Sequence, residues 1–464
     1  MNKMDKMDKK DRDKKDSQPN EPVAPLSRRS VLKNGAAAIG GAATVLGGGL
    51  GGGLAARAAT PLRQTNVGRP FRGLVRRGTG VRVEDLRLLP IQPREVVVRT
   101  EASAACYTIV RQVLGTNNTN QASIPNHSGV GIVEEVGPMV KRVQVGDRVV
   151  VPGTPQCGQC YHCLQGRSDW CQFLSTAPPH PVAEMLDGTE VFESGALGGL
   201  SEIMVVAEEY LCPVFTDVPP AELSLLGDTI GTGLAAGRNL VAIRPGWDVV
   251  VLGAGPVGLG AIQSARIASA AQIIVVEPIA YRRQVALDLG ATSVLDPNAE
   301  GDRLVETIRS MCEGPTGRRF AGGRAWNDAL FAVPRGPDVT IEAVGGDQYA
   351  PAVEVGPDPT GILPLQQAFE FTRSGGHIVT LGFGQQGNVE FPAWAFANRG
   401  RTFHAGQQGG LNMLRDIPRY VRLIEQGSID TASVVTATYA IDQARDAVQA
   451  VADRTTVAAV VVFE

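Results

Sequence analysis

The sequence predicts an α/β protein with two domains, one β-rich and barrel-like and the other a doubly wound sheet covered by helices. Short apolar strands separated by glycine turns lie between residues 95 and 152, whereas strands alternate with helical stretches from about residue 240 onward. The chain has 464 residues, which is long for one hydrophobic core. Hydrophobic residues make up 43% and the formal net charge is -3, values that suit a soluble globular protein and give no electrostatic case for nucleic acid.

Residues 1–58 predict a disordered N-terminus followed by an export signal. Residues 1–26 are dominated by Lys, Asp, Asn, Gln and Pro, and Ser-Arg-Arg-Ser-Val-Leu-Lys at 27–33 resembles a twin-arginine signal. An uncharged Gly/Ala-rich stretch and an Ala-x-Ala site at 56–58 follow. We therefore expect passage through the twin-arginine translocase, from the cytoplasm to a periplasmic or other extracytoplasmic location. An uncleaved tether and an incidental basic pair before a linker are the alternatives.

The β-rich domain is predicted from three apolar runs. They cover residues 95–100, 130–136 and 148–151, and Gly137 and Gly146 mark turns between them. Runs of this length, bounded by turn residues, are typical of a small barrel or sandwich.

The second domain is predicted from a strand–turn–helix–strand unit. The apolar run 248–252 leads directly into Gly-Ala-Gly-Pro-Val-Gly, an apolar helix follows, and a second run at 272–276 ends at an acidic residue. Runs at 338–345 and 376–382 continue the series. Such glycines permit a tight turn and close approach of a pyrophosphate to the positive end of a helix. The predicted dinucleotide-binding residues are Gly253, Gly255, Pro256, Val257, Gly258 and Glu277. A glycine turn with packing duties alone is the alternative.

The acidic residue at the end of the second run favours one cofactor. A carboxylate at Glu277 accepts hydrogen bonds from a ribose 2′-hydroxyl and repels a 2′-phosphate, so NAD is expected. NADP is the less favoured alternative, supported by Arg282 and Arg283.

Cysteine spacing predicts a structural zinc site. Four of the seven cysteines follow the pattern C-x2-C-x2-C-x7-C, at Cys157, Cys160, Cys163 and Cys171. Two disulfides are the alternative. Export to an oxidising compartment does not favour them, because the thiolates can bind zinc in the cytoplasm before the folded protein is exported. Cys106, His127 and Asp228 supply three further potential ligands, and a three-ligand zinc site keeps one position open for chemistry. We therefore expect two zinc ions per chain. Taken alone, His127 would be a core histidine bonded to the backbone.

From residue 85 onward the chain resembles the zinc-containing medium-chain alcohol dehydrogenases. The matching motifs are C-x-T at 106–108, the histidine of 124–127, Gly-Asp-Arg-Val at 146–149, the cysteine lobe, the 226–233 segment with the third ligand, 400–402 and the closing run 457–463. The resemblance implies a GroES-like catalytic domain at 59–230 and 407–464, with the structural zinc lobe at 157–171. It also implies a Rossmann NAD-binding domain at 231–406.

The same resemblance implies a zinc-dependent oxidoreductase. The substrate would be a small alcohol or carbonyl compound bound to zinc, and hydride would pass between it and NAD. Zinc assists because it lowers the pKa of a bound alcohol and polarises a carbonyl. Thr108 would relay the proton and Thr232 would lie near the nicotinamide. A homo-oligomer, dimer or tetramer, is usual for the family. Because free NAD is not expected outside the cytoplasm, tightly bound NAD is a further expectation, with the loops around 312–336 and 355–359 expected to cover its adenosine half.

Several positions depart from the family pattern. Asn126 and Ser128 flank the histidine where glycine and glutamate are usual, and Ile109 replaces a common aspartate. Loss of a carboxylate that orients a ligating histidine costs about ten- to a hundredfold in metal affinity or activity. Ala458 stands where members often carry a basic residue near the pyrophosphate. One alternative is therefore an exported zinc protein of this fold with a degenerate site and no dehydrogenase activity. The other, a zinc-free quinone reductase, is disfavoured by the cysteine lobe and Glu277.

Overall fold

The computed structural model describes residues 66–175, 179–193, 197–312 and 335–464, and the predicted export signal lies outside these ranges. All described residues belong to the compact unit that spans Ala59–Glu464. Within the described ranges, no helix is both long enough and apolar enough to cross a membrane.

The β-rich part contains a small closed barrel and a second sheet. The barrel strands, in spatial order, are β1 (Pro70–Gly78), β2 (Gly80–Leu88), β7 (Pro181–Met185), β8 (Glu190–Glu193) and β4 (Thr119–Ile124). The second sheet runs β10 (Cys212–Pro213), β6 (Arg148–Val151), β5 (Gly129–Val136), β3 (Glu95–Ala104), β18 (Ala458–Val462) and β17 (Val435–Tyr439), with β9 (Ile203–Ala207) also paired to β3. The predicted run 148–151 has the observed bounds of β6, whereas the run at 95 extends to Ala104.

The other part is a six-stranded parallel sheet. Its spatial order is β13 (Ser293–Leu295), β12 (Gln272–Val276), β11 (Asp248–Leu252), β14 (Val339–Glu342), β15 (His377–Thr380) and β16 (Thr402–His404). Counted along the chain this order is 3-2-1-4-5-6, the doubly wound arrangement of dinucleotide-binding folds. The predicted α/β class with a β-rich domain and a Rossmann-type sheet is therefore confirmed.

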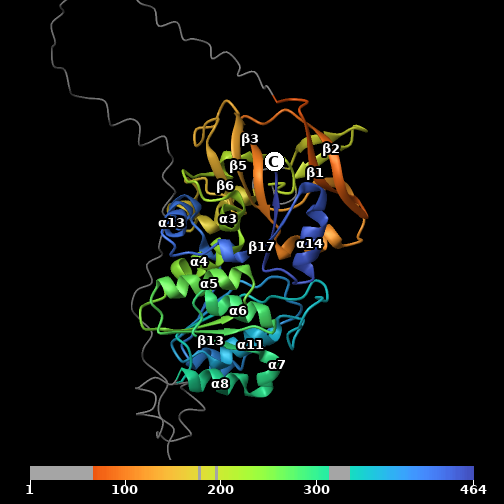
Figure 1. Ribbon diagram of the computed structural model, residues 1–464. Helices are drawn as coiled ribbons and strands as arrows, with labels where there is room; N and C mark the ends of the chain where they lie inside the picture. The colour runs from red at the N-terminus through yellow and green to blue at the C-terminus, as the bar shows by residue number, and fades with distance from the viewer. Residues whose placement is uncertain (1–65, 176–178, 194–196, 313–334) are drawn as a thin grey trace, which may run out of the picture. The chain divides into compact units, whose positions relative to one another are not determined.

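Strand β11 shows why these strands are continuous apolar runs. Val249 and Val251 belong to one hydrophobic cluster, whereas Val250 and Leu252 belong to another. Because successive side chains point to opposite faces, a strand covered on both sides must be apolar at every position. The covering helices include α5 (Pro256–Ile267), α6 (Ala280–Asp288), α8 (Leu304–Met311) and α11 (Ile362–Phe371). Figure 1 shows this part at the bottom of the view.

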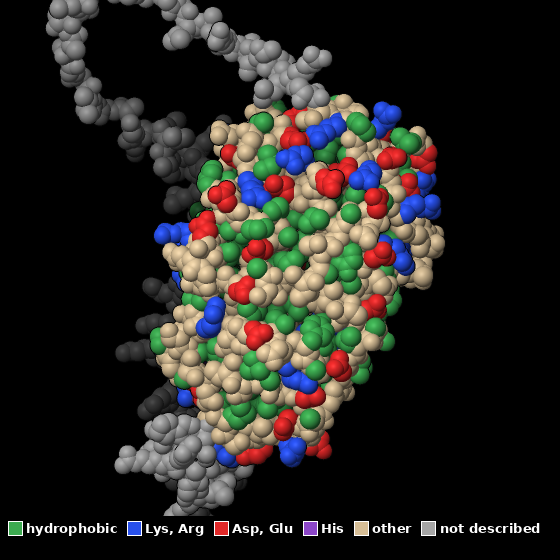
Figure 2. Space-filling model, viewed as in Figure 1, with side chains coloured by type: hydrophobic (Ala, Val, Ile, Leu, Met, Phe, Trp, Pro, Cys, Tyr) green, Lys and Arg blue, Asp and Glu red, His purple; other side chains and the backbone are tan. Residues whose placement is uncertain are grey.

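After β16 the chain returns to the β-rich part. Helix α13 (Met413–Glu425) precedes β17, and helix α14 (Ala444–Ala452) lies between β17 and β18. Strand β18 pairs with β3. These blue elements lie in the upper half of Figure 1. On the face drawn in Figure 2, acidic and basic side chains are interspersed rather than gathered by sign.

Helix α4 (Thr229–Ala235) packs against α5 with almost no space between the two backbones. A Cβ added at Gly233 would lie 2.0 Å from the Val257 carbonyl oxygen, and one added at Gly260 would lie 2.4 Å from that of Ile230. Only glycine permits this approach. The contact fixes the start of α4, where Asp228 lies, relative to the glycine turn that begins α5.

Candidate active site

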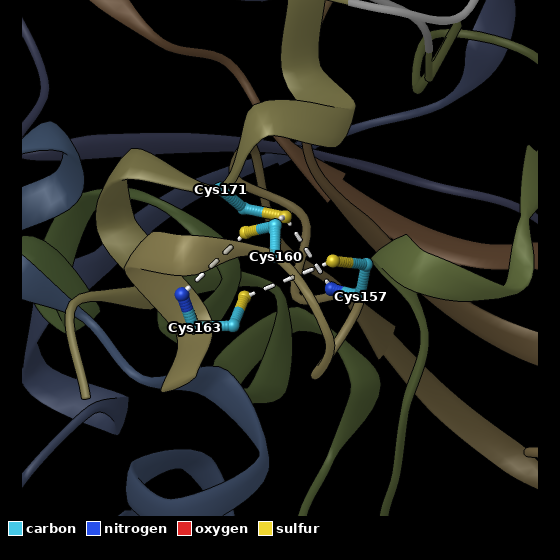
Figure 3. A group of neighbouring side chains, drawn as sticks. All are labelled: Cys157, Cys160, Cys163 and Cys171. Carbon is cyan, nitrogen blue, oxygen red and sulfur yellow. Dashed lines mark hydrogen bonds between the residues drawn. The ribbon is translucent and has the colours of Figure 1, made fainter. Parts of the chain in front are cut away.

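The four clustered cysteines converge on one point, as Figure 3 shows. Cys157 Sγ lies 4.0 Å from Cys163 Sγ, and Cys160 Sγ lies 4.0 Å from Cys171 Sγ. A disulfide requires about 2.05 Å, so these are free thiols, and the disulfide alternative does not describe this structure. Four thiolates at about 2.3 Å from zinc would be separated by about 3.8 Å. The sulfur positions therefore fit a tetrahedral metal.

Backbone amides in this lobe point at sulfur atoms. Cys163 N–H donates to Cys160 Sγ at 3.5 Å, and Cys157 N–H donates to Cys171 Sγ at 3.4 Å. Burial alone would raise the pKa of Cys160, but such N–H donors outweigh burial and lower the pKa to about 6. Amide donors stabilise the thiolate form that binds a metal.

The second predicted ligand set also converges. Cys106 follows β3, His127 lies between β4 and β5, and Asp228 precedes α4, yet their ligand atoms all lie within 4.8 Å of one another. His127 Nε2 is 3.3 Å from Asp228 Oδ2. The Thr108 hydroxyl donates to Cys106 Sγ at 3.0 Å and lies 3.4 Å from His127 Nε2. A thiol, an imidazole and a carboxylate at this separation suit zinc.

These three side chains perturb each other's ionisation. Burial raises the pKa of the Cys106 thiol, and the Asp228 carboxylate raises it further. Burial opposes a charged His127, but Asp228 and Cys106 outweigh burial and hold the imidazole pKa well above its usual range. Burial opposes a charged Asp228 as well, yet His127 brings its pKa below the usual value. The anionic groups of Asp228 and Cys106 thus stabilise a positive charge beside them, here on the protonated His127. A bound divalent cation would supply that positive charge to the same ligand atoms.

Asn126 explains how the histidine is presented without the expected glycine. Its φ is +79°, a left-handed conformation that asparagine tolerates better than most residues. The side-chain amide donates to Ser103 Oγ at 2.7 Å and to the Ala104 carbonyl at 2.9 Å. The substitution therefore keeps the backbone geometry and adds a buried anchor for His127.

A cavity of about 210 Å³ extends from Cys106 of this cluster to the predicted dinucleotide turn. Its lining includes Cys106, Thr108, Gly253, Gly255, Pro256, Val257, Glu277 and Arg282. A Cβ on Gly255 would meet only Arg282 Nη1, at 3.8 Å, so this face of the turn is open. Gly258 lies beneath the turn, where a Cβ would come within 1.9 Å of the Gly253 carbonyl oxygen. The glycines thus combine close packing on one side of the turn with an open face on the other.

Residues 92–217 match the family model described as alcohol dehydrogenase GroES-like domain, and residues 256–426 match the model described as zinc-binding dehydrogenase. The chain belongs to the zinc-containing medium-chain alcohol dehydrogenase family. Like the family as a whole, it is an oxidoreductase of the alcohol dehydrogenase type.

Similar proteins agree with this assignment. The chain is 26% identical to an NDMA-dependent alcohol dehydrogenase of Amycolatopsis methanolica, over 81% of this chain and 94% of the relative. It is 28% identical to an alcohol dehydrogenase class-3 of Myxine glutinosa, over 79% and 90%. A benzyl alcohol dehydrogenase structure from Acinetobacter calcoaceticus has a TM-score of 0.70 at 24% identity, covering 85% of this chain and 100% of that one, and shows the shared fold.

Glu277 has a structural task besides lining the cavity. One carboxylate oxygen accepts from Ala254 N–H at 2.6 Å and the other from Ile279 N–H at 3.0 Å, so the residue ties the glycine turn to the end of β12. Each oxygen keeps a further lone pair for a ligand.

Thr232 does not line the cavity. Its hydroxyl donates to the Asp228 carbonyl within its own helix. Thr229, one turn earlier, does line the cavity, and its buried hydroxyl has no hydrogen-bond partner among the described residues. The sequence did not single out Thr229, because the rotation of α4 about its axis decides whether the hydroxyl of Thr229 or that of Thr232 faces the cavity.

Gln408 is a second residue that sequence reasoning missed. It lies in a left-handed conformation with φ +46° in the segment returning from the parallel sheet. Its amide nitrogen donates to the Gly227 carbonyl at 2.7 Å and lies 3.4 Å from Asp228 Oδ1, while Oε1 accepts from Thr154 N–H and Oγ1. Gln408 therefore orients the carboxylate ligand. The only local signal is the left-handed tendency of the Gln-Gln-Gly-Gly sequence.

Ile109 is buried beside the cluster, where the family commonly has an aspartate. Across the described ranges no side chain bonds to His127 Nδ1, so orientation of the ligands comes from Thr108, Asn126 and Gln408 instead.

The loop after β14 lies over the cavity. Residues 356–358 line it, whereas the loop at 313–334 lies outside the described residues. Gln348 N–H donates to Tyr107 Oη at 2.9 Å, and Asp347 pairs with Arg454. Asn298 Nδ2 donates to the Val355 carbonyl at 2.8 Å. The segment 347–360 is thus bonded to both parts of the protein.

Proposed function

We propose that this protein is a zinc- and NAD-dependent oxidoreductase that interconverts a small alcohol and its carbonyl compound. The observation that carries the proposal is the cavity that reaches from Cys106, which groups with His127 and Asp228, to the glycine turn. Cys157, Cys160, Cys163 and Cys171 would hold a second, structural zinc. The catalytic domain would comprise residues 59–230 and 407–464, and the NAD-binding domain residues 231–406.

The residues of the chain would bind, orient and exclude water. When bound, zinc supplies Lewis acidity toward the alcohol oxygen, and NAD accepts the hydride. Thr108 Oγ1 lies 3.0 Å from Cys106 Sγ in a residue that lines the cavity, and it would accept the alcohol proton while its own hydroxyl proton is released toward solvent. The lining includes the apolar side chains of Leu252, Val276, Val344, Leu381 and Phe383, which would limit the entry of water when substrate and NAD fill the cavity.

NAD suits this cavity better than NADP. The buried Glu277 carboxylate would face a 2′-phosphate directly. Arg283, one candidate for binding that phosphate, donates to the carbonyls of Glu277 and Pro278 and lies 3.4 Å from Asp296. Its charge is therefore engaged elsewhere.

A homo-oligomer is part of the proposal. Strand β16 ends the parallel sheet, and an aromatic cluster lies beside it, with Phe396 stacked on Phe403 at 6.0 Å between centroids. Trp394, Phe396 and Phe403 are exposed by 44%, 58% and 38%. Among the described residues no strand pairs with the outer edge of β16, and such an edge next to exposed aromatic rings is suited to pairing with a second copy.

Export by the twin-arginine route is proposed on the sequence at residues 27–33. Replacing Arg28 and Arg29 together by lysine should retain the protein in the cytoplasm, as measured by fractionation, while the unaltered chain reaches the extracytoplasmic fraction. Equal export of both chains would contradict the assignment.

Metal counting and chromatography of nucleotide released by denaturation test the enzymatic proposal. The purified protein should contain two zinc ions and NAD and should oxidise alcohols. Cys106→Ser should lose one zinc and the activity, whereas Cys312→Ser, a buried thiol outside both clusters, should keep both. One zinc, no nucleotide and no activity in the unaltered protein would favour the degenerate alternative.

A further inference from the structure

Arg282 carries a buried charge without a counter-charge. The residue is only 9% exposed, yet among the described residues no carboxylate oxygen lies within 4.0 Å of its guanidinium. Burying an unpaired charge is strongly unfavourable. A buried cation that lines a cavity is therefore suited to an anionic ligand.

The guanidinium is held in place by neutral groups. Nε donates to Tyr281 Oη at 3.1 Å, and Nη2 donates to the Thr456 carbonyl at 2.8 Å. Tyr281 in turn donates to the Arg454 carbonyl at 2.7 Å, which fixes the hydroxyl that receives Nε–H. These bonds position the side chain but leave its charge uncompensated.

The remaining nitrogen faces the glycine turn. Nη1 has no protein partner among the described residues, and it lies 3.8 Å from the place that a Cβ on Gly255 would occupy. Gly255 is the N-cap of the 12-residue helix α5, whose first turn directs amides and a positive dipole end toward the same space. Two independent features, a helix start and a buried cation, thus point at one position.

Other charges near the cavity differ from Arg282. Arg454 also lines the cavity but is paired with Asp347, and Arg283 is engaged by Asp296 and by backbone carbonyls. The buried strand position Ala458 provides no charge at all. Arg282 is therefore the cation best placed to meet a phosphate at this turn.

We propose that Arg282 binds the diphosphate of the dinucleotide through Nη1, opposite the amides at the start of α5. The inference rests on the proposed function, because it assumes that a dinucleotide enters this cavity. It assigns Arg282 to the diphosphate rather than to the 2′-phosphate of NADP or to the adenosine ribose.

Calorimetric titration of the zinc-loaded protein, after removal of any bound nucleotide, tests the assignment. The probes are ADP-ribose, adenosine, NAD and NADP, and the variants are Arg282→Gln, Arg282→Lys and the exposed control Arg303→Gln. Loss of one charge-assisted contact should weaken ADP-ribose about 10- to 100-fold in Arg282→Gln. NAD and NADP should weaken by the same factor, and adenosine should be unaffected. Arg282→Lys should recover part of the affinity, which also covers the case of a poorly folded glutamine variant.

Each contrary result has a distinct meaning. Equal weakening of adenosine and ADP-ribose would assign Arg282 to the ribose, and weakening of NADP alone would assign it to the 2′-phosphate. Unchanged ADP-ribose affinity in Arg282→Gln would overturn the inference and leave the proposed function intact. If the unaltered protein bound neither ADP-ribose nor NAD, both the inference about Arg282 and the proposed function would be refuted.

Discussion

Replacing Gln408 by alanine should weaken the catalytic metal site while leaving the cysteine lobe unchanged. The side chain makes three hydrogen bonds of 2.7 to 3.0 Å, one to Gly227 and two from Thr154, besides the 3.4 Å contact with Asp228 Oδ1. At about 1 kcal/mol each, their loss should cost about 3 kcal/mol of stability. Loss of a group that orients a metal ligand typically costs about 10- to 100-fold in metal affinity.

Competition with a chromophoric chelator measures this effect. The unaltered protein should release two classes of zinc, and only one class should leave more readily in Gln408→Ala. The neighbouring Gln407 is exposed and has no bond to the site, so Gln407→Ala is the matched control. Identical release from both variants would show that Asp228 does not depend on Gln408.

Three further outcomes follow from the structure. Cys163→Ser should lose one zinc and lower Tm by several degrees while the other zinc remains, as measured by metal analysis and calorimetry. Phe396→Glu should shift the protein to a smaller species in light scattering, whereas Phe215→Glu, at a site 85% exposed elsewhere, should not. Asp347→Asn should speed release of bound NAD about tenfold, because it removes the ion pair with Arg454, whereas the exposed Glu354→Gln should not. Unchanged metal content, size or release rate, respectively, would contradict these expectations.

The strands were predictable where burial on both faces leaves a continuous apolar run. Residues 248–252 and 272–276 have the observed bounds of β11 and β12, and every side chain after the first of each strand is buried in a core. The barrel strands β1 and β2 escaped prediction. Arginines interrupt β1, and Arg82, Glu84 and Asp85 interrupt β2, so neither strand is a continuous apolar run.

The two groups of candidate metal ligands differ in how close together their residues lie in the sequence. Spacing alone brings the four cysteines of 157–171 together, because one short helix and its flanking turns carry them all. Cys106, His127 and Asp228 come from separate segments, so their convergence was expected through the family resemblance and not from spacing. Gln408 reaches the same site although it lies 180 positions after Asp228 in the chain, a contact that no sequence pattern encodes.

If the proposed export and NAD use both hold, the loop at 347–360 bears on how the enzyme would work without free NAD. Opening the cleft between the two parts would break the bonds from Gln348 to Tyr107, the Ala352 bond to the Asp453 carbonyl and the Asp347–Arg454 pair. Several such bonds, each about 1 kcal/mol, make release slow relative to exchange of a small substrate. Reoxidation of the nucleotide in place then requires that a second substrate enter the same cavity after the first product leaves. The proposal consequently predicts parallel-line, ping-pong kinetics with an alcohol and an aldehyde, and a sequential pattern would show instead that NAD exchanges freely.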